Sequence, residues 1–376
     1  MMCAVTGYRA ETTRRALGEL ARAGLRHDEF LVEVIELVGR AVPYDAMCVA
    51  TTDPATNMFT DSRKVGLEDD GGPRFMYHEY AVQDVAKFAE LAQRPYGVGV
   101  LREETKGDPA SSARFTELLR PVFGAEHELR GVARSGGLMW GAFALYRGAG
   151  APAFNEAEAD FLAQLEPTIA DGLRASILAS AASDGIGGVG GPAVLVFDAD
   201  GRLLSATASA EDLARDLDAM AGDDLWRVTP VAIDGLVQRL RVGDGAVPRA
   251  RVRGRSGRWY SLHAAPFRGQ EGATRQLVVT IEPARPPEIL PLLMAAYGLT
   301  DRETAVVQAL LRGESTHAIA QALHLSPYTV QDHFKAIFEK IGVSSRREVA
   351  TRVFYGHYLD GYQEQRIGVD GSPVQA

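Results

Sequence analysis

A short stretch near the end of the chain gathers polar side chains that can hydrogen-bond to nucleotide bases. Thr329, Gln331, Asp332 and Lys335 follow the dipeptide Ser326-Pro327, which is typical of a helix start. Amide, carboxylate and ammonium groups on one exposed helix face can read base edges in the major groove of DNA. The spacing predicts such a surface, provided that the other side of the helix is buried.

An apolar stripe occupies the other side of this expected helix. Val330, Phe334, Ile337, Phe338 and Ile341 recur at intervals of one to four residues. A second apolar set just upstream predicts a shorter helix, joined to the first through the tight turn at residues 324–326; its members are Ile319, Ala320 and Leu323. Two short helices joined in this way, the second with a polar outer face, are what a major-groove reader requires.

Helix start and stop signals frame the whole C-terminal segment. Thr300 precedes Glu303 by three residues, and Ser345 precedes Glu348 by three, so each pair predicts a capping box at a helix N-terminus. Gly342, like Gly313, lies where a helix end needs a left-handed residue. These signals therefore predict several short helices with sharp boundaries in this segment.

These motifs resemble the LuxR/NarL family of bacterial transcriptional regulators. The matching stretches are Leu299-Thr300-Asp301-Arg302-Glu303, Ile319-Ala320 with Leu323, Leu325-Ser326-Pro327-Tyr328-Thr329-Val330, and Ile341-Gly342-Val343-Ser344-Ser345-Arg346. The resemblance implies an all-α four-helix module that binds double-stranded DNA, with its third helix in the major groove and its fourth helix in a homodimer. The implied DNA-binding positions are Thr329, Val330, Gln331, Asp332, Lys335 and Arg346.

The dimer is also expected on physical grounds. Seven Lys or Arg face six Asp or Glu between residues 299 and 357, so a single module carries little net positive charge. A symmetric pair doubles the basic surface. We expect the seam to involve Val349, Val353 and Tyr355, the alternative being that the two valines pack inside one module.

Asp332 has three possible roles. Its carboxylate can accept a hydrogen bond from a cytosine amino group, temper non-specific attraction to phosphates, or pair with Lys335 three residues later. We expect base reading or tempering rather than pairing.

Two α+β domains are expected upstream. From Asp28 to Ser180, a helix, a strand at residues 46–50, a hairpin at Gly136-Gly137 and a long helix capped by Asn155 resemble a GAF-type sensor. The next domain resembles a PAS-type sensor in its strand at residues 194–204, with an Asp-Ala-Asp-Gly turn, and in its late strand at residues 259–263. Both resemblances imply antiparallel sheets flanked by helices, which often bind small molecules. A filled core that serves only as scaffold is the alternative for each.

The expected fold class is therefore multi-domain, with GAF-like and PAS-like α+β domains followed by the all-α module. The boundaries that we predict are an N-terminal polar segment at 1–27, the GAF-like domain at 28–183, a linker at 184–191, the PAS-like domain at 192–283, a linker at 284–298, the DNA-binding domain at 299–357 and a disordered tail at 358–376.

Several other kinds of chemistry lack their signatures. The Asp198–Gly201 turn lacks the acidic spacing of a calcium loop, and the sequence has no Gly-Lys-Ser/Thr of a phosphate-binding loop. His78, His127 and His263 are expected to be surface or satisfied core residues, and Trp140 and Trp259 are expected in the core rather than in a ligand cage. We expect no cofactor, no metal and no catalytic activity.

The composition fits a cytoplasmic protein without a membrane segment or an export signal. The net charge is −9, and Cys3 and Cys48 are far apart in the sequence and outside any CxxC motif. The chain is expected to be a one-component transcriptional regulator that senses an unknown small molecule or partner. The alternative is a signalling scaffold whose C-terminal module does not bind DNA.

Overall fold

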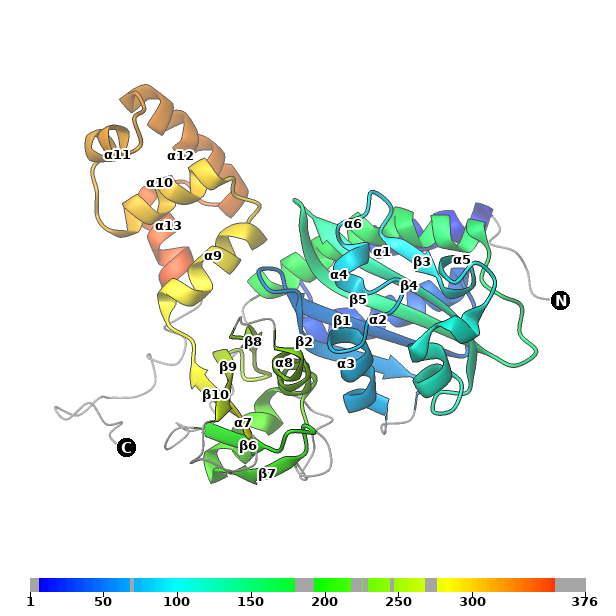
Figure 1. The fold of residues 1–376 in the computed structure, drawn as a ribbon. Helices are drawn as coiled ribbons and strands as arrows, with labels where there is room; N and C mark the ends of the chain where they lie inside the picture. The colour runs from blue at the N-terminus through cyan, green and yellow to red at the C-terminus, as the bar shows by residue number, and fades with distance from the viewer. Residues whose placement is uncertain are drawn as a thin grey trace, which may run out of the picture. The chain divides into compact units, whose positions relative to one another are not determined.

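A computed structural model describes residues 7–67, 71–179, 193–217, 225, 229–243, 247–267 and 276–355, without the side chains of residues 354 and 355. The chain forms two compact units, one built mainly from residues before Ala284 and the other mainly from Ala284 onward (Figure 1). Within the described ranges, no helix combines the length and the apolar character that a membrane crossing requires.

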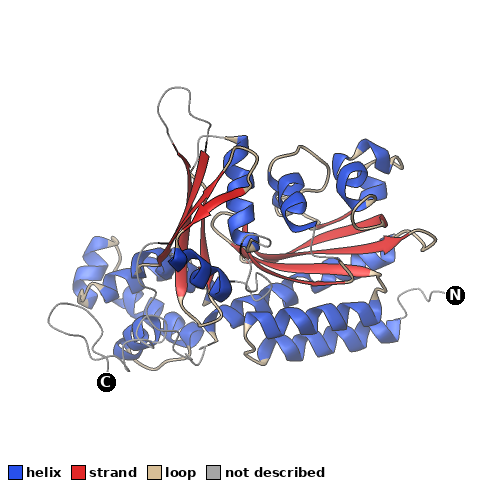
Figure 2. Cartoon of the chain, turned by 90° about the horizontal axis from the view of Figure 1, so that it is seen from below, coloured by secondary structure: helices blue, strands red, loops and turns tan. Residues whose placement is uncertain are grey.

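The first domain is an antiparallel sheet between two layers of helices. Its strands lie in the order β2-β1-β5-β4-β3. Helix α6, with α1 and α2, covers one face (Figure 2), and the shorter helices α3, α4 and α5 lie on the other side. The bounds are α1 Gly7–Arg22, α2 His27–Ala41, β1 Ala46–Asp53, β2 Met58–Val65, α3 Gly72–Tyr80, α4 Phe88–Leu91, β3 Val98–Val100, α5 Leu101–Glu104, η2 Pro109–Ser111, η3 Phe115–Leu119, β4 Ala125–Ser135, β5 Leu138–Gly148 and α6 Glu156–Leu178.

Local signals set the boundaries of these elements as expected. Gly136 and Gly137 both adopt positive φ, 62° and 75°, and join β4 to β5 in a two-residue hairpin turn. Asn155 caps α6, since its side chain accepts from the Glu158 amide at 3.0 Å and the Glu158 carboxylate accepts from the Asn155 amide.

The second domain repeats this strand order. Its strands lie as β7-β6-β10-β9-β8, so each sheet places its first and fifth strands side by side. The Asp198 carboxylate accepts from the amides of Asp200 and Arg202 and closes the expected turn after β6. The bounds are β6 Ala193–Phe197, β7 Leu203–Ala206, α7 Ala208–Leu217, α8 Val231–Val242, β8 Arg249–Arg253, β9 Trp259–Phe267 and β10 Gln276–Pro283.

The C-terminal unit consists of short helices with side-chain caps. Thr300, Ser315, Ser326 and Ser345 each accept a hydrogen bond from a backbone amide of the helix that they begin. Val306, Val307, Ile319 and other apolar residues form its core. The bounds are α9 Pro286–Ala296, α10 Asp301–Leu311, α11 Thr316–Ala322, α12 Pro327–Ile341, α13 Arg346–Ala350 and η4 Thr351–Tyr355.

Two predicted boundaries need correction. The N-terminal segment at 1–27 carries α1, which buries Ala10, Thr13 and Leu17 and packs against α2 and α6, so it belongs to the first domain. The linker predicted at 284–298 carries α9, because Pro286 and Pro287 fit the first turn of a helix, where no amide donor is needed. The linker predicted at 184–191 and the tail at 358–376 lie outside the described residues.

Candidate functional site: a nucleic-acid interface and an apolar cavity

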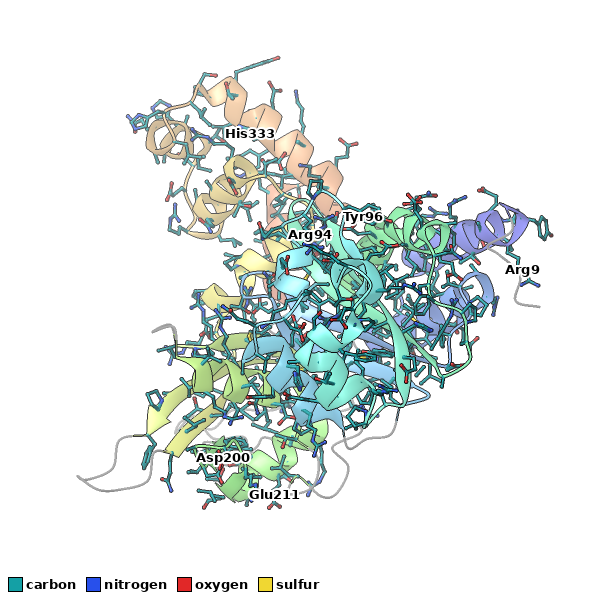
Figure 3. All side chains as sticks on the ribbon, turned by 45° about the vertical axis from the view of Figure 1, so that its right-hand side comes forward. Arg9, Arg94, Tyr96, Asp200, Glu211 and His333 are labelled. Carbon is teal, nitrogen blue, oxygen red and sulfur yellow. The ribbon has the colours of Figure 1, made fainter. Side chains whose placement is uncertain are left out.

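Helix α12 has the two faces that its sequence predicts. Val330, Phe334, Ile337 and Ile341 are buried against the rest of the unit. The exposed side carries Tyr328, Gln331, Asp332, Lys335 and Glu339. Figure 3 shows the side chains along this helix, with His333 labelled among them. The polar side chains at 331, 332 and 335 therefore share one solvent-facing surface.

The turn before α12 sets where the helix begins and therefore which side chains lie on its exposed face. His324 takes a left-handed conformation with φ 53°, which ends α11 sharply. The Ser326 hydroxyl oxygen then accepts from the Thr329 amide at 3.0 Å, and Gly342 ends the helix with φ 73°. The Thr329 hydroxyl lies 2.8 Å from that of Ser326, so Thr329 is a part of the cap and borders the polar face.

Val330 corrects the expected set of DNA-binding residues. Its side chain is fully buried, in the same stripe as Phe334. It stabilises the helix from within and does not contribute to the exposed face.

Asp332 and Lys335 form an ion pair in the free protein. The Lys335 ammonium lies 3.0 Å from Oδ1 of Asp332, with the two side chains 73% and 48% exposed, respectively. Pairing is thus the arrangement in the structure, whereas the sequence favoured base reading or tempering. Such an exposed pair is worth only about 0.2–1 kcal/mol, so it can open when a stronger partner arrives.

Arg346 holds other parts of the unit in place. Its guanidinium donates to the Thr316 hydroxyl at 2.9 Å and to the Glu314 carbonyl at 2.7 Å, and it lies 4.7 Å from the centre of the Phe334 ring. These contacts connect the start of α13 to α11 and to the buried side of α12. Arg346 therefore positions other parts of the unit, and its expected contact with DNA stays a prediction.

Two of the three residues expected at a dimer seam are interior. Val349 and Val353 are 0% and 1% exposed within a single chain, so they pack inside the module. This burial corrects the predicted seam in favour of the alternative. The side chain of Tyr355 lies outside the described residues.

Tyr328 belongs to the polar face, although it was not among the expected DNA-binding residues. Its side chain is 74% exposed, immediately after Pro327 in the first turn of α12. The sequence signal was its place opposite the apolar stripe. A phenol there can donate to a phosphate oxygen.

A cavity of about 290 Å³ lies in the unit that contains the two sheets, and its mainly apolar lining also includes Arg63, Lys64 and Asp234. Its floor includes small side chains of the central strands, namely Cys48 and Ala50 of β1 with Ala142 and Ala144 of β5. Aromatic side chains surround the space; they are Phe59, Phe75, Phe88, Phe123 and Tyr146. Because small residues stand where a filled core would have large ones, the sheet leaves room for a guest molecule.

Two titratable groups on the cavity wall are held neutral by burial. Burial raises the pKa of the Cys48 thiol to about 11. Burial, and then the negative charge of Glu128, raise the pKa of Tyr146 well above its usual value. Among the described residues, no group of three or more His, Cys, Asp or Glu side chains could hold a metal ion.

The histidines and tryptophans that were expected to be surface or core residues are not all satisfied, because Nδ1 of His78 and Nε1 of Trp259 are buried and form no hydrogen bond with any described residue. His78, Trp140 and Trp259 are buried. His127 Nε2 lies 3.1 Å from the Ala151 carbonyl oxygen, and His263 Nε2 lies 3.1 Å from the Ser261 hydroxyl.

Sequence comparisons concern the C-terminal segment. Residues 298–353 match the family model "Bacterial regulatory proteins, luxR family". UhpA of Escherichia coli K12, a transcriptional regulatory protein, is 45% identical over 58 residues, which are 15% of this chain and 30% of UhpA. DesR of Bacillus subtilis 168, also a transcriptional regulatory protein, is 39% identical over 67 residues, 18% of this chain and 34% of DesR. The chain thus spans about a third of these curated relatives.

Solved structures show weaker likeness. The GAF domain of an Acinetobacter phosphoenolpyruvate-protein phosphotransferase is 14% identical, with a TM-score of 0.32, over 45% of this chain and 93% of that one. Vibrio cholerae VqmA, solved in complex with ligand and DNA, is 18% identical, with a TM-score of 0.23, over 45% of this chain and 84% of that one. TM-scores this low do not establish a shared fold. The match of residues 298–353 is what identifies a part of the molecule: the C-terminal segment is a helix-turn-helix domain of the luxR family of bacterial regulatory proteins.

Proposed function

We propose that the protein is a cytoplasmic, DNA-binding transcriptional regulator that acts as a homodimer and senses a small molecule in its N-terminal part. The observation that carries the proposal is the exposed polar face of α12 on a capped helix-turn-helix domain. The first domain, which we regard as GAF-like, contributes the cavity. We regard the second domain as PAS-like because its antiparallel sheet is flanked by α7 and α8. We assign no catalytic activity and no cofactor.

On DNA, each exposed residue of α12 would contact the group that its side-chain chemistry suits. Gln331 presents an amide that can pair with an adenine edge, and Lys335 presents an ammonium suited to a guanine edge or a phosphate. Asp332 can accept from a cytosine amino group once its ion pair with Lys335 opens. Tyr328 and Thr329 lie at the helix N-terminus, where a phosphate is favoured.

A salt titration tests DNA binding directly. Binding of the full chain to genomic DNA fragments is measured between low and physiological salt. We expect log K to fall linearly with log salt, because phosphate contacts release counterions. Lys335→Ala should weaken binding by about 1–3 kcal/mol if the ammonium contacts a base.

Arg312→Ala is the matched control for this experiment. Arg312 is an exposed cation at the end of α10, paired with Glu314 and outside helix α12. We expect this variant to bind as the parent does. Equal losses in both variants would indicate a general charge effect, and an unchanged Lys335→Ala protein would remove Lys335 from the interface.

A signalling scaffold is the second candidate, because the helical segment carries little free positive charge. Lys335 pairs with Asp332, and Lys340 pairs with Glu303 at 2.6 Å. If the salt titration detects no binding to any DNA fragment, the scaffold reading replaces the regulator.

A further inference from the structure

One wall of the cavity comes from the second domain. Thr229, Val231 and Asp234, at and just before the start of α8, line the same space as the residues of the first sheet. Val231 also packs against the apolar cluster of the first domain that contains Phe59, Phe75 and Phe88. A molecule in the cavity would therefore touch both domains.

The two domains interlock beside this wall. Met58 of β2 belongs to the buried core of the second domain, and Tyr80 of α3 packs against the cores of both. A Cβ atom placed on Gly235 of α8 would lie 3.1 Å from Met58 and from Tyr80, so the helix approaches closely where it has no side chain.

A buried ion pair strengthens this contact. Asp53, at the end of β1, accepts from the Arg251 guanidinium at 2.5 Å and from the Arg251 backbone amide at 2.9 Å. Its side chain is 1% exposed and that of Arg251 is 13% exposed. Strand β8, which carries Arg251, is thereby tied to the first sheet close to α8.

Tyr146 supplies a hydrogen-bonding group with no partner. Its hydroxyl is buried and forms no hydrogen bond with any described residue, and its ring lines the cavity. A phenol is protonated at neutral pH, and the raised pKa of Tyr146 extends this to higher pH, so the hydroxyl can donate. A buried polar group of this kind costs free energy unless a bound molecule satisfies it.

We propose that the cavity binds a small, uncharged, mostly aromatic molecule with one hydrogen-bond acceptor for Tyr146, and that α8 of the second domain is a part of the binding site. The inference deepens the proposed sensor function and rests on it. The volume lies at the lower end of the roughly 300–1,000 Å³ of small-molecule sites, which suits a compact ring system. Binding then holds the two domains together.

Naphthalene and quinoline test the ligand class, because they share a shape and differ by one ring nitrogen acceptor. Equilibrium dialysis measures the dissociation constants of both for the full chain and for Tyr146→Phe. We expect both probes to bind, and the preference for quinoline over naphthalene to fall about threefold to tenfold in the variant. The ratio cancels the different hydration of the two probes. Since the hydroxyl has no partner among the described residues, Tyr146→Phe should fold normally.

Val231→Phe tests the wall from the second domain. A larger side chain there enters the cavity, and we expect both probes to bind about tenfold more weakly or worse. Val242→Phe is the control, because Val242 ends the same helix and is 52% exposed. It should bind both probes as the parent chain does.

Three results would each overturn the inference: no binding of either probe, an unchanged probe ratio in Tyr146→Phe, or unchanged binding in Val231→Phe. The same preparations are assayed for DNA binding without probe. If the protein binds DNA but neither probe, only this inference is contradicted. If it binds the probes but not DNA, the proposed function as a regulator is contradicted.

Discussion

At the scale of single residues, the functional groups are governed by their immediate partners. The Lys335 ammonium has an acidic neighbour, Asp332, one turn away, so this ion pair competes with the DNA contact that we propose for Lys335. Cys48 and Tyr146 face an apolar space that keeps both neutral. In each case the neighbour, rather than the residue type alone, decides what the group can do.

Asp332→Asn should raise non-specific DNA affinity roughly twofold to fivefold, because it frees Lys335 and removes a charge that repels phosphates. It should also change the sequences selected from a random pool if the carboxylate reads a cytosine. Glu339→Gln, which removes an exposed charge about two turns further along α12, is the control. If both variants show the same affinity and the same selected sequences, Asp332 has no special part in recognition.

Cys48 should react slowly with iodoacetamide in a Cys3→Ser background. With a pKa of about 11, the thiol has roughly a hundredfold less thiolate at pH 8 than an ordinary cysteine. The rate should therefore rise about tenfold per pH unit from pH 7 to pH 10. Unfolded protein is the control, and a rate that levels off near pH 9 in the folded chain would contradict the raised pKa.

At the scale of elements, the helix-turn-helix domain is held by caps that also connect helices. The Glu303 carboxylate closes the capping box of α10 and accepts from Lys340 at the end of α12 at 2.6 Å. Burial alone would raise the pKa of Glu303, but the hydrogen bonds from Lys340 and Thr300 outweigh it and lower the pKa. Helix α12 is therefore fixed to α10 by the ionised carboxylate of Glu303.

Glu303→Gln should destabilise this domain by about 1–2 kcal/mol at pH 7. Because the folded state lowers the pKa, the ionised carboxylate stabilises the domain above the unfolded pKa, and this stabilisation is lost as pH falls through the folded pKa. The difference between variant and parent should thus shrink from pH 7 to pH 4, as measured by hydrogen exchange of α10 and α12 amides at matched pH. Glu314→Gln, in the more exposed Arg312 pair, should show little effect at either pH.

At the scale of the molecule, the unit with the two sheets behaves as a pair of domains with a shared cavity wall. The Asp53–Arg251 pair and the Met58 contact join cores that are far apart in sequence. Ligand binding and domain docking should therefore be linked, each favouring the other to the same extent.

Asp53→Asn should loosen this docking, because breaking a buried ion pair costs about 3 kcal/mol or more. We expect thermal unfolding to separate into two transitions and quinoline to bind more weakly than to the parent chain. Excess quinoline should bring the transitions together again. Asp171→Asn, in an exposed pair with Arg174, is the control. A single transition with unchanged quinoline binding would show that the pair does not couple the domains.

The sequence by itself determined the local features of this protein. The caps at Asn155, Thr300 and Ser345, the glycine turn at 136–137 and the two faces of α12 depend on neighbours within a few residues, so they can be read from spacing. The same local motifs carried the family resemblance that residues 298–353 confirm.

Only the tertiary structure decided the features that depend on residues distant in sequence. Val330, Val349 and Val353 are interior because other helices cover them, and Arg346 is engaged by α11 and α12. The burial of α1 and α9 and the α8 wall of the cavity follow from long-range packing. Amphipathic spacing shows that a face is apolar, but which partner buries that face depends on contacts between distant segments.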